Sequence, residues 1–372
     1  MNAGFDRLGV ARAERLDRDA SALDAWLAAG RHGSMAWLQR NPGRRADPRK
    51  LLPGCESVVV LLSNYDPGPE AGPPPPGHGR VARYARGRDY HKVLGRALKH
   101  LASWLEQATG ETTRAFVDTA PLLERAWAER AGLGWIGKNA NLITQDLGSW
   151  VLIGEILTAA TIEADPGPHA DRCGSCSACL DACPTGAIVE PGVVDSRLCI
   201  SYWTIEHRGA IPPTARAGNG SWIFGCDVCQ EVCPWNRTFA RPVDPERFSR
   251  RDELAAPAAA GILELDERAF RARYSGTSLM RARWDGMRRN ACIVLGNLRR
   301  DEAMPSLSRA LGDDDAMIRR HAAWALGRIG GARAAGALSA AAAKERSPDV
   351  AAEIDRATKA AAGVDPDRDE VS

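Results

Sequence analysis

Cysteines dominate the chemistry available to this sequence, because eight of the ten lie between residues 173 and 233, in two runs that each end in Cys-Pro. The first run is Cys173-x-x-Cys176-x-x-Cys179-x-x-x-Cys183-Pro. This is the bacterial ferredoxin pattern, in which three closely spaced thiolates ligate one [4Fe–4S] cluster and the fourth ligates a second cluster. The spacing therefore predicts a module that transfers electrons one at a time.

The second run, Cys226-x-x-Cys229-x-x-x-Cys233-Pro, is one cysteine short, because Ile223 stands where the full pattern has its first thiol. Cys199 is the natural replacement. The two predicted ligand sets are then Cys173, Cys176, Cys179 and Cys233 for one cluster, and Cys183, Cys199, Cys226 and Cys229 for the other. A pair of structural zinc sites is the main alternative, but zinc favours two separated pairs of ligands. Disulfides would not require ferredoxin spacing.

The elements that must hold this chemistry begin with an N-terminal region of alternating helices and strands, predicted as an α/β or α+β domain over residues 1–164. Expected strands are 57–65, 113–117 and 150–160, and expected helices are 1–40, 90–107 and 121–131. The Cys-rich module follows at 165–245. Outside the pattern, Cys55 and Cys292 are expected to be packing residues.

The remaining region, 246–362, is rich in Ala, Leu and Arg and contains an internal repeat. Arg-x-Ala-x-x-x-Leu-Gly occurs at 289–296 and again at 320–327, an offset of 31 residues. Two such copies predict stacked helical hairpins of the HEAT-like, α-solenoid kind. Residues 363–372 are predicted to be a disordered tail. The chain as a whole is thus predicted to be an α+β multidomain protein.

The N-terminal domain is expected to hold a second redox centre, and its most distinctive stretch is 117–143. Three glycines around Trp135 predict a close approach of backbone to another group, and polar side chains follow. These residues are Gly132, Gly134 and Gly137, then Lys138, Asn139 and Asn141. No Gly-x-Gly-x-x-Gly follows a predicted strand and no Walker loop is present, so a Rossmann nucleotide site is not supported.

Asp118 follows a predicted strand, where α/β proteins collect catalytic groups, and it could donate a proton to a substrate that accepts electrons. The alternative is that Asp118 or Thr119 caps a helix opened by Pro121. The segment beginning at Asp89 resembles the start of the Asp-x-His-x-x-Gly cobalamin motif, but its glycine stands one place late. We therefore expect His91 to be a polar surface or phosphate contact and not a cobalt ligand.

The net charge is only +2, but basic residues are concentrated locally. Residues 80–100 contain seven Arg or Lys against one acid, and residues 281–333 contain eleven Arg against six acids. Such zones predict a polyanionic partner, or else solvated helix faces. No apolar run is long enough to span a bilayer, and the sequence opens without a secretion signal, so we expect a cytoplasmic protein.

Taken together, these motifs make the sequence similar to the epoxyqueuosine reductases, over residues 4–330. The matching stretches are RYARGRDYHKVL from Arg83, VDTAPLLERAWAERAGLGWIGKNANLI from Val117, the cysteine set, SYWTIEHRG from Ser201, WIFGCDVCQEVCPWN from Trp222, WDGMRRNACIVLGN from Trp284 and HAAWALG from His321. The resemblance implies reduction of epoxyqueuosine to queuosine at the wobble position of tRNA, the last step of queuosine biosynthesis. It also implies base-off cobalamin, reduced through two [4Fe–4S] clusters.

The same resemblance implies roles for individual residues. Asp118 is the expected catalytic acid. Expected cobalamin contacts are Arg86, Asp118, Trp135, Gly137, Lys138, Asn139, Asn141 and Ser201, and expected tRNA contacts are Arg83, Arg88, Arg208, Arg289 and Arg320. The expected partners of a monomeric enzyme are a tRNA with a GUN anticodon and a reductase, ferredoxin or flavodoxin as electron donor.

Two other functions fit parts of the sequence. A corrinoid-dependent reductive dehalogenase-like reductase of a small molecule shares the cobalamin and two-cluster plan. Such enzymes, when secreted, carry a twin-arginine leader and would not need a basic helical tail. A non-enzymatic electron carrier would leave the N-terminal domain and the helical repeats unexplained.

Overall fold

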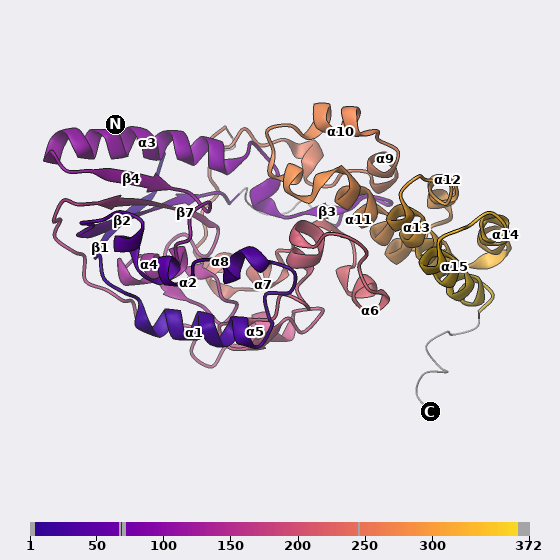
Figure 1. Ribbon diagram of the computed structural model, residues 1–372, viewed down its shortest axis with the longest axis horizontal. Helices are drawn as coiled ribbons and strands as arrows, with labels where there is room; N and C mark the ends of the chain where they lie inside the picture. Colours follow the sequence, from indigo (N-terminus) through magenta and orange to yellow (C-terminus); the bar gives the residue numbers. More distant parts are fainter. Residues whose placement is uncertain (1–3, 67, 69–71, 245, 364–372) are drawn as a thin grey trace. The chain divides into compact units, whose positions relative to one another are not determined.

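The computed structural model describes residues 4–66, 68, 72–244 and 246–363, and the chain forms two compact units (Figure 1). The first unit comprises Met1–Pro69, Gly87–Cys199 and Asp227–Arg250, and the second comprises Glu70–Arg86, Ile200–Cys226 and Arg251–Ser372. The chain passes between the units several times, whereas the sequence predicts domains that follow one another. Of the predicted disordered tail, 364–372 lie outside the described residues.

A four-stranded antiparallel sheet forms the centre of the first unit (Figure 1). Its strands, in spatial order, are β1 (Arg7–Arg12), β2 (Ser57–Asn64), β7 (Val151–Thr158) and β4 (Thr113–Phe116). All residues of β2 are buried, which explains why its sequence is a continuous apolar run without polar alternation. The three predicted strands are confirmed to within two residues at each end.

Helices α3 (Tyr90–Thr109) and α4 (Glu124–Arg130) pack against this sheet. Leu98 of α3 lies over Gly154 of β7, where an added Cβ would come within 2.6 Å of Leu98 Cδ1. Trp127 of α4 is fully buried in the core that includes the β2 valines. The start of α3 thereby lies beside the loop that follows β4, which carries the candidate acid.

The prediction that residues 1–40 are helical is wrong at its start. Residues Arg7–Arg12 form the edge strand β1, and the helix α1 occupies only Asp17–Ala28. The strand has only six residues, and its three buried residues are consecutive, so its sequence lacks the alternation that would predict a strand. It is stabilised by its pairing with β2, some fifty residues further along the chain.

The cysteine runs carry short helices joined to two small ribbons in the first unit. The helices are α5 (Ala178–Asp181), α7 (Val228–Glu231) and α8 (Pro234–Thr238), and the ribbons pair β5 (Trp135–Ile136) with β6 (Leu142–Ile143) and β8 (Ile188–Glu190) with β9 (Val193–Val194). Helices α5 and α7 pack against each other. The two runs of similar spacing therefore form two similar turns that face each other.

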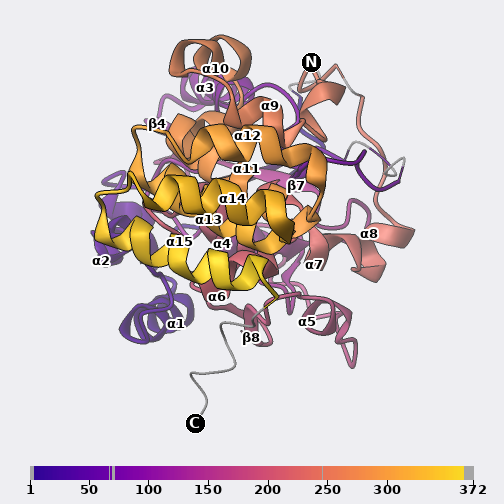
Figure 2. The same ribbon diagram turned by 90° about the vertical axis from the view of Figure 1, so that its right-hand side faces the viewer.

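Stacked helices build most of the second unit (Figure 2). The helices that pack in succession are α11 (Arg283–Leu298), α13 (Ala316–Ile329) and α15 (Pro348–Ala361). Two glycines permit the close contact: a Cβ on Gly296 would lie 2.7 Å from the Trp324 ring, and one on Gly327 would lie 2.8 Å from Ala357 Cα. The repeated Leu-Gly thus marks the seam between successive helices, and the predicted stack of helical hairpins is confirmed.

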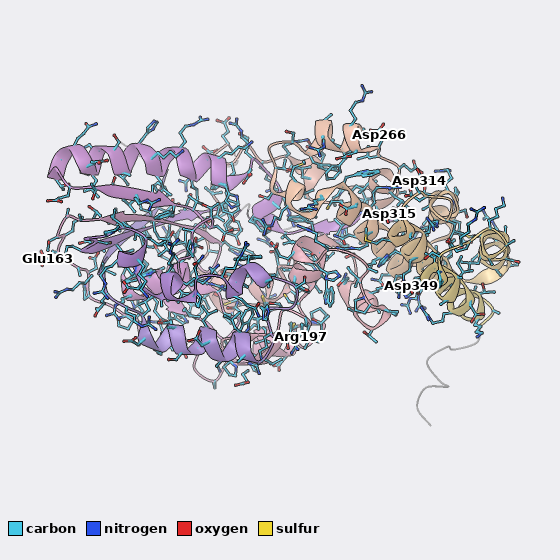
Figure 3. All side chains as sticks on the ribbon, in the orientation of Figure 1. Glu163, Arg197, Asp266, Asp314, Asp315 and Asp349 are labelled. Atoms are coloured by element: carbon cyan, nitrogen blue, oxygen red, sulfur yellow. The ribbon has the colours of Figure 1, made fainter. Side chains whose placement is uncertain are left out.

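The other elements of the second unit complete this stack. They are the paired strands β3 (Arg80–Val81) and β10 (Trp222–Phe224), and the helices α6 (Pro213–Arg216), α9 (Ala259–Leu263), α10 (Glu267–Tyr274), α12 (Met304–Ala310) and α14 (Gly331–Ala342). Asp266 and Asp315, labelled in Figure 3, cap α10 and α13 by accepting hydrogen bonds from the backbone at Ala269 and Met317.

Short helical turns and one short helix lie between these elements. The helix is α2 (Pro42–Ala46), the 3₁₀ turns are Ala36–Gln39, Pro48–Lys50, Arg83–Ala85, Ala217–Asn219, Asp252–Leu254, Ser278–Ala282 and Asp301–Ala303, and a π-helical turn spans Tyr202–Glu206. The longest helix, α3, buries one apolar face and exposes a charged one. Among the residues that the structure describes, no helix combines the length and apolar character needed to cross a bilayer.

Candidate functional site

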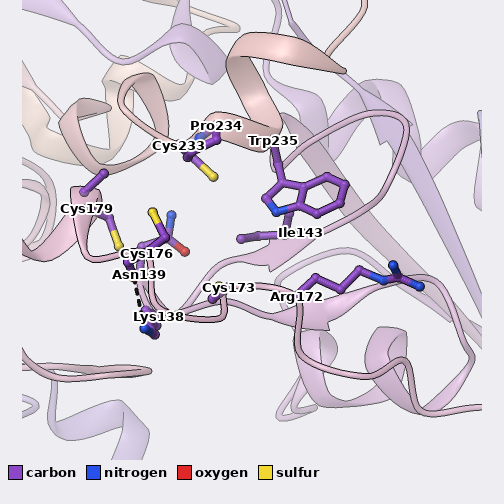
Figure 4. Close-up of a pocket in the computed structure, with 11 residues that line it drawn as sticks. Lys138, Asn139, Ile143, Arg172, Cys173, Cys176, Cys179, Cys233, Pro234 and Trp235 are labelled. Atoms are coloured by element: carbon purple, nitrogen blue, oxygen red, sulfur yellow. Dashed lines mark hydrogen bonds between the residues drawn. The ribbon is translucent and has the colours of Figure 1, made fainter.

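Four cysteines line one cavity of about 170 Å³ in the first unit (Figure 4). They are Cys173, Cys176, Cys179 and Cys233, the set that the swapped ferredoxin pattern predicts for one cluster. The remaining walls are Lys138, Asn139, Ile143, Arg172, Ala178, Pro234 and Trp235. Figure 4 shows Cys179 and Cys176 on the left of the view, Cys233 above them toward the centre, and Trp235 on the right. The fold therefore brings a thiol of the second run to three thiols of the first.

The donors around this cavity suit an iron–sulfur cluster. Thiolates are the ligands that such clusters prefer, and a lysine beside them favours the anionic cluster. Lys138 Nζ donates hydrogen bonds to the carbonyl oxygens of Gly174 at 2.7 Å and Cys176 at 2.9 Å, which fixes the loop that carries the thiols. Burial, followed by the neighbouring Cys173, raises the pKa of Cys179, so this thiol would stay protonated until a metal takes the thiolate.

Three members of the second predicted set also lie near one another in the first unit. Burial raises the pKa of Cys229 well above its ordinary value, and the charges of Cys199 and Cys183 add to this effect. The backbone N–H of Ala187 donates a hydrogen bond to Cys183 Sγ at 3.3 Å, a contact of the kind that tunes cluster thiolates. Cys226 ends a segment of the second unit, so its place in this set stays a prediction.

The candidate acid Asp118 stands just beyond β4 with an exposed carboxylate. Its side chain is 56% exposed, and its Oδ2 atom accepts a hydrogen bond from the Tyr90 hydroxyl at 2.7 Å. The same oxygen lies 3.5 Å from His91 Nε2, and the ring of His91 stacks on Tyr90 with centroids 4.1 Å apart. One carboxylate oxygen is thus held by the start of α3, while the side chain remains open to solvent.

The protonation states of this group follow from its neighbours. Burial works against a charged His91, but Asp118 and Asp89 outweigh it and raise the pKa of His91 to about 9. Partial desolvation would raise the pKa of Asp118, but hydrogen bonds from His91 and Tyr90 lower it overall. At neutral pH the pair is therefore an imidazolium beside a carboxylate, with the exchangeable proton on His91.

The helix-capping interpretation of Asp118 is wrong. Helix α4 begins at Glu124, its N-cap residue is Leu123, and no side chain caps it. The hydrogen bond runs in the opposite direction, because the backbone N–H of Asp118 donates to Glu124 Oε1 at 2.7 Å. Asp118 has φ of 50°, a left-handed conformation that residues with a Cβ rarely adopt.

The glycines around Trp135 serve packing within the chain. A Cβ on Gly134 would lie 2.2 Å from the Ile143 carbonyl oxygen, and one on Gly137 would lie 2.4 Å from Ile143 Cδ1. Trp135 itself is 1% exposed, with its ring edge-on to Trp235. The close neighbours of Trp135 and Gly137 are thus the strand β6 and the cluster module, and their expected contact with cobalamin stays a prediction.

Three family profiles match the chain. One described as "Epoxyqueuosine reductase QueG, DUF1730" covers residues 45–119, a "4Fe-4S double cluster binding domain" covers 172–236, and "HEAT repeats" cover 278–357. The curated epoxyqueuosine reductase of Synechocystis sp. is 46% identical over 289 residues, which cover 76% of this chain and 98% of that protein. This chain belongs to the epoxyqueuosine reductase family. The family member from Pseudomonas aeruginosa is 41% identical over 332 residues, covering 88% of this chain and 91% of that one.

Solved structures of epoxyqueuosine reductases share the whole fold. One, with a tRNA-Tyr epoxyqueuosine-modified stem loop, matches with a TM-score of 0.91 at 32% identity, over 97% of this chain and 96% of that chain. Another, from Bacillus subtilis, has its catalytic aspartate loop swung out of the active site and matches with a TM-score of 0.88 at 32% identity, over 96% and 95%. The predicted reductase activity, double [4Fe–4S] domain and HEAT-like region are confirmed.

Two of the arginines expected to contact tRNA form hydrogen bonds with other residues of the second unit. Arg289 is 1% exposed, and its guanidinium donates to the carbonyl oxygens of Trp203, His207 and Gly209. Arg320 Nε bonds Glu353 Oε2 at 3.0 Å. Arg289 thus points into the protein, which argues against its assignment to a tRNA phosphate, whereas the assignment of Arg320, whose side chain is 24% exposed, stays a prediction.

The other predicted residues have different environments. Arg86 is buried and its Nε donates to the Val81 carbonyl at 2.8 Å, and its assignment as a cobalamin contact stays a prediction. Arg88 is exposed, while Arg208 is exposed with its guanidinium held by the carbonyls of Ile205 and Arg281. The half-buried residues are Arg83, Lys138, Asn141 and Ser201, whereas Asn139 is buried.

Sequence reasoning missed the groups that surround the candidate acid Asp118. Tyr90 and His91 lie in the incomplete Asp-x-His-x-x-Gly motif, which did not predict a cobalt ligand. Their distance from Asp118 in the sequence gives no sign that the three residues meet. Glu155 offered a clearer signal, because it is an acid within an apolar strand. It is fully buried between Val60 and Phe116 of the neighbouring strands.

Proposed function

We propose that this chain reduces epoxyqueuosine to queuosine at the wobble position of a GUN-anticodon tRNA, the last step of queuosine biosynthesis. Family membership supports the activity, and the full-length likeness to a structure with an epoxyqueuosine-modified stem loop supports the substrate. The observation within this chain that carries the proposal is the exposed carboxylate of Asp118, held between Tyr90 and His91. The reaction takes two electrons and two protons and releases the epoxide oxygen as water, so the site must supply both.

Protons reach the substrate through Asp118. His91 stores a proton on Nε2 at neutral pH, and Tyr90 orients the Asp118 carboxylate by donating its hydroxyl proton to Oδ2. When the epoxide oxygen of the substrate approaches, Asp118 passes the proton from His91 to that oxygen as the first carbon–oxygen bond breaks. His91 takes up a second proton from solvent, which follows the same path as the second carbon–oxygen bond breaks and water leaves. The open side of the carboxylate leaves room for the substrate, and the buried side keeps the acid in place.

Electrons reach the site through the thiol-ligated clusters, supplied by an external reductase, ferredoxin or flavodoxin. Cobalamin, when bound, would supply a low-valent cobalt that is a strong one-electron reductant or nucleophile. His91 would not be a ligand of the cobalt, because its Nδ1 contacts Asp89 Oδ1 at 2.7 Å and its Nε2 faces Asp118, which leaves neither nitrogen for a metal. We propose Asp118 and Asn141 of the first unit as contacts of the cofactor, with Lys138 and Asn139 linking its site to the cluster loops, while Ser201 of the second unit stays a prediction.

The tRNA is proposed to bind through the arginines that remain accessible. Arg88 is exposed next to the helix that carries Tyr90 and His91, and Arg208 lies in the second unit with the exposed Arg281 and Arg283 as charged neighbours. Arginines on a near-neutral protein provide local sites for phosphates.

The decisive experiment is the modified-nucleoside profile of tRNA from a strain that lacks this chain. We expect epoxyqueuosine to replace queuosine, and a plasmid copy of the wild-type chain to restore queuosine. The Asp118→Asn copy should fail to restore it while accumulating to the same level. An unchanged queuosine content in the deletion strain would refute the proposal, and dehalogenation of a small substrate by the purified protein would favour the alternative reductase function.

A further inference from the structure

The loop from Asp118 to Glu124 is closed on itself by one hydrogen bond. The backbone N–H of Asp118 donates to Glu124 Oε1 at 2.7 Å. The side chain of Glu124, the first residue of α4, thus holds the backbone of Asp118. Helix α4 is a fixed base for this contact, because Trp127 in its middle is fully buried against the sheet. The loop therefore has a rigid anchor at one end and the acid at the other.

Asp118 needs such an anchor. Its φ of 50° is a strained conformation for a residue with a side chain, and strain of this kind persists only where the surroundings impose it. The Tyr90 hydroxyl and His91 hold the carboxylate, but the backbone of Asp118 is held by Glu124. In the Bacillus subtilis relative the catalytic loop is swung out of the active site, so a loop of this family has more than one position.

We propose that Glu124 is a positioning residue that holds Asp118 in the active site, and that breaking its bond to the Asp118 N–H releases the loop. The inference rests on the proposed function, in which Asp118 is the acid. Glu124 touches neither substrate nor cofactor in this scheme and acts only through Asp118.

The charge on Glu124 makes this anchor sensitive to pH. Burial first, and the Asp118 carboxylate second, raise the pKa of Glu124 to about 8. The charged or titratable groups that face it are Asp118, Arg125, His91, Glu155 and Arg45. Glu155 is fully buried, and neither of its carboxyl oxygens has a hydrogen-bond partner among the described residues, so it supplies no compensating donor. Ionised Glu124 would accept the Asp118 N–H more strongly, but the repulsion between the two carboxylates is the larger effect, so ionisation would loosen the loop.

Three variants test the proposal in the reconstituted full-length protein: Glu124→Ala, Glu124→Gln, and the control Glu111→Ala, which removes an exposed carboxylate just before β4. Alanine removes the acceptor, whereas glutamine keeps a carbonyl Oε1 and cannot ionise. We expect single-turnover reduction of epoxyqueuosine tRNA to be about tenfold slower in Glu124→Ala, the effect of one hydrogen bond. Glu124→Gln should be about tenfold faster than Glu124→Ala at pH 7, with iron content and tRNA affinity equal in all variants.

Hydrogen exchange at the Asp118 amide, followed by mass spectrometry, supplies a readout independent of activity. The peptide containing Asp118 should exchange about tenfold faster in Glu124→Ala than in Glu124→Gln or Glu111→Ala. The single-turnover rate of the wild type should fall as pH rises past about 8, and Glu124→Gln should keep its turnover rate until His91 titrates near pH 9.

Equal turnover or equal exchange in Glu124→Ala and Glu124→Gln would overturn the positioning role. Failure of the wild type to convert epoxyqueuosine would instead overturn the proposed function. In that case the exchange comparison still decides whether Glu124 anchors the loop, because it needs no substrate.

Discussion

Replacing Asp118 by asparagine tests the role of its carboxylate in proton transfer without removing the side chain. The amide keeps the shape of the carboxylate and an oxygen that can accept from the Tyr90 hydroxyl, but it carries no charge and cannot take the proton of His91 and pass it on. Losing a general acid slows a reaction about 10²- to 10⁴-fold, which corresponds to roughly 3 to 5 kcal/mol in the activation barrier. We expect the single-turnover rate of queuosine formation to fall within this range.

The same substitution should move a second, measurable quantity. Asp118 and Asp89 together raise the pKa of His91 to about 9 against the opposing effect of burial. Without the charge of Asp118, only Asp89 remains, so the pKa of His91 should fall toward its ordinary value of about 6.5. NMR titration of labelled histidine measures this shift directly, and a melting curve shows whether the fold is intact.

Asp89→Asn is the matched control, because it also lowers the pKa of His91 but leaves the acid in place. Asp89 caps α3 by accepting from the His91 N–H, a role that asparagine also fills. The control should turn over faster than Asp118→Asn although both shift His91. An Asp118→Asn rate within twofold of wild type would refute the assignment of the acid.

Three further changes test other parts of the structure. Cys199→Ala should lose or degrade one cluster and keep the other, so anaerobic iron analysis should fall from eight irons per chain toward four; stoichiometric zinc without iron would contradict both clusters. Gly296→Ala should lower the free energy of unfolding by about 1–3 kcal/mol through overpacking against Trp324. Gly336→Ala in α14, where no described neighbour lies within 4 Å, should raise it by about 0.5–1 kcal/mol. Urea denaturation measures both, and equal effects would refute the close helix contact at Gly296. Arg88→Ala should weaken tRNA binding and reduce its salt slope by about one unit, and an unchanged slope would remove Arg88 from the interface.

The sequence by itself determined the chemistry that depends on local spacing. The ferredoxin pattern predicted the double cluster domain, because ligand geometry around a cubane fixes the distances between neighbouring cysteines. The Leu-Gly repeat predicted the helical stack, since each glycine is needed where one helix contacts the next. The buried strand 57–65 was equally clear from its unbroken apolar run.

Tertiary structure alone decided which distant residues meet. Asp118, Tyr90 and Glu124 come from the end of a strand and the starts of two helices, and only the packing of those helices on the sheet joins them. It also decided which groups the repeated arginines contact. Arg289 and Arg320 were predicted to bind tRNA, and both donate hydrogen bonds to acceptors of the second unit. The physical reason is that a charged side chain has the same sequence signature on a solvated face and in a buried hydrogen-bond network, and only the positions of its acceptors distinguish the two.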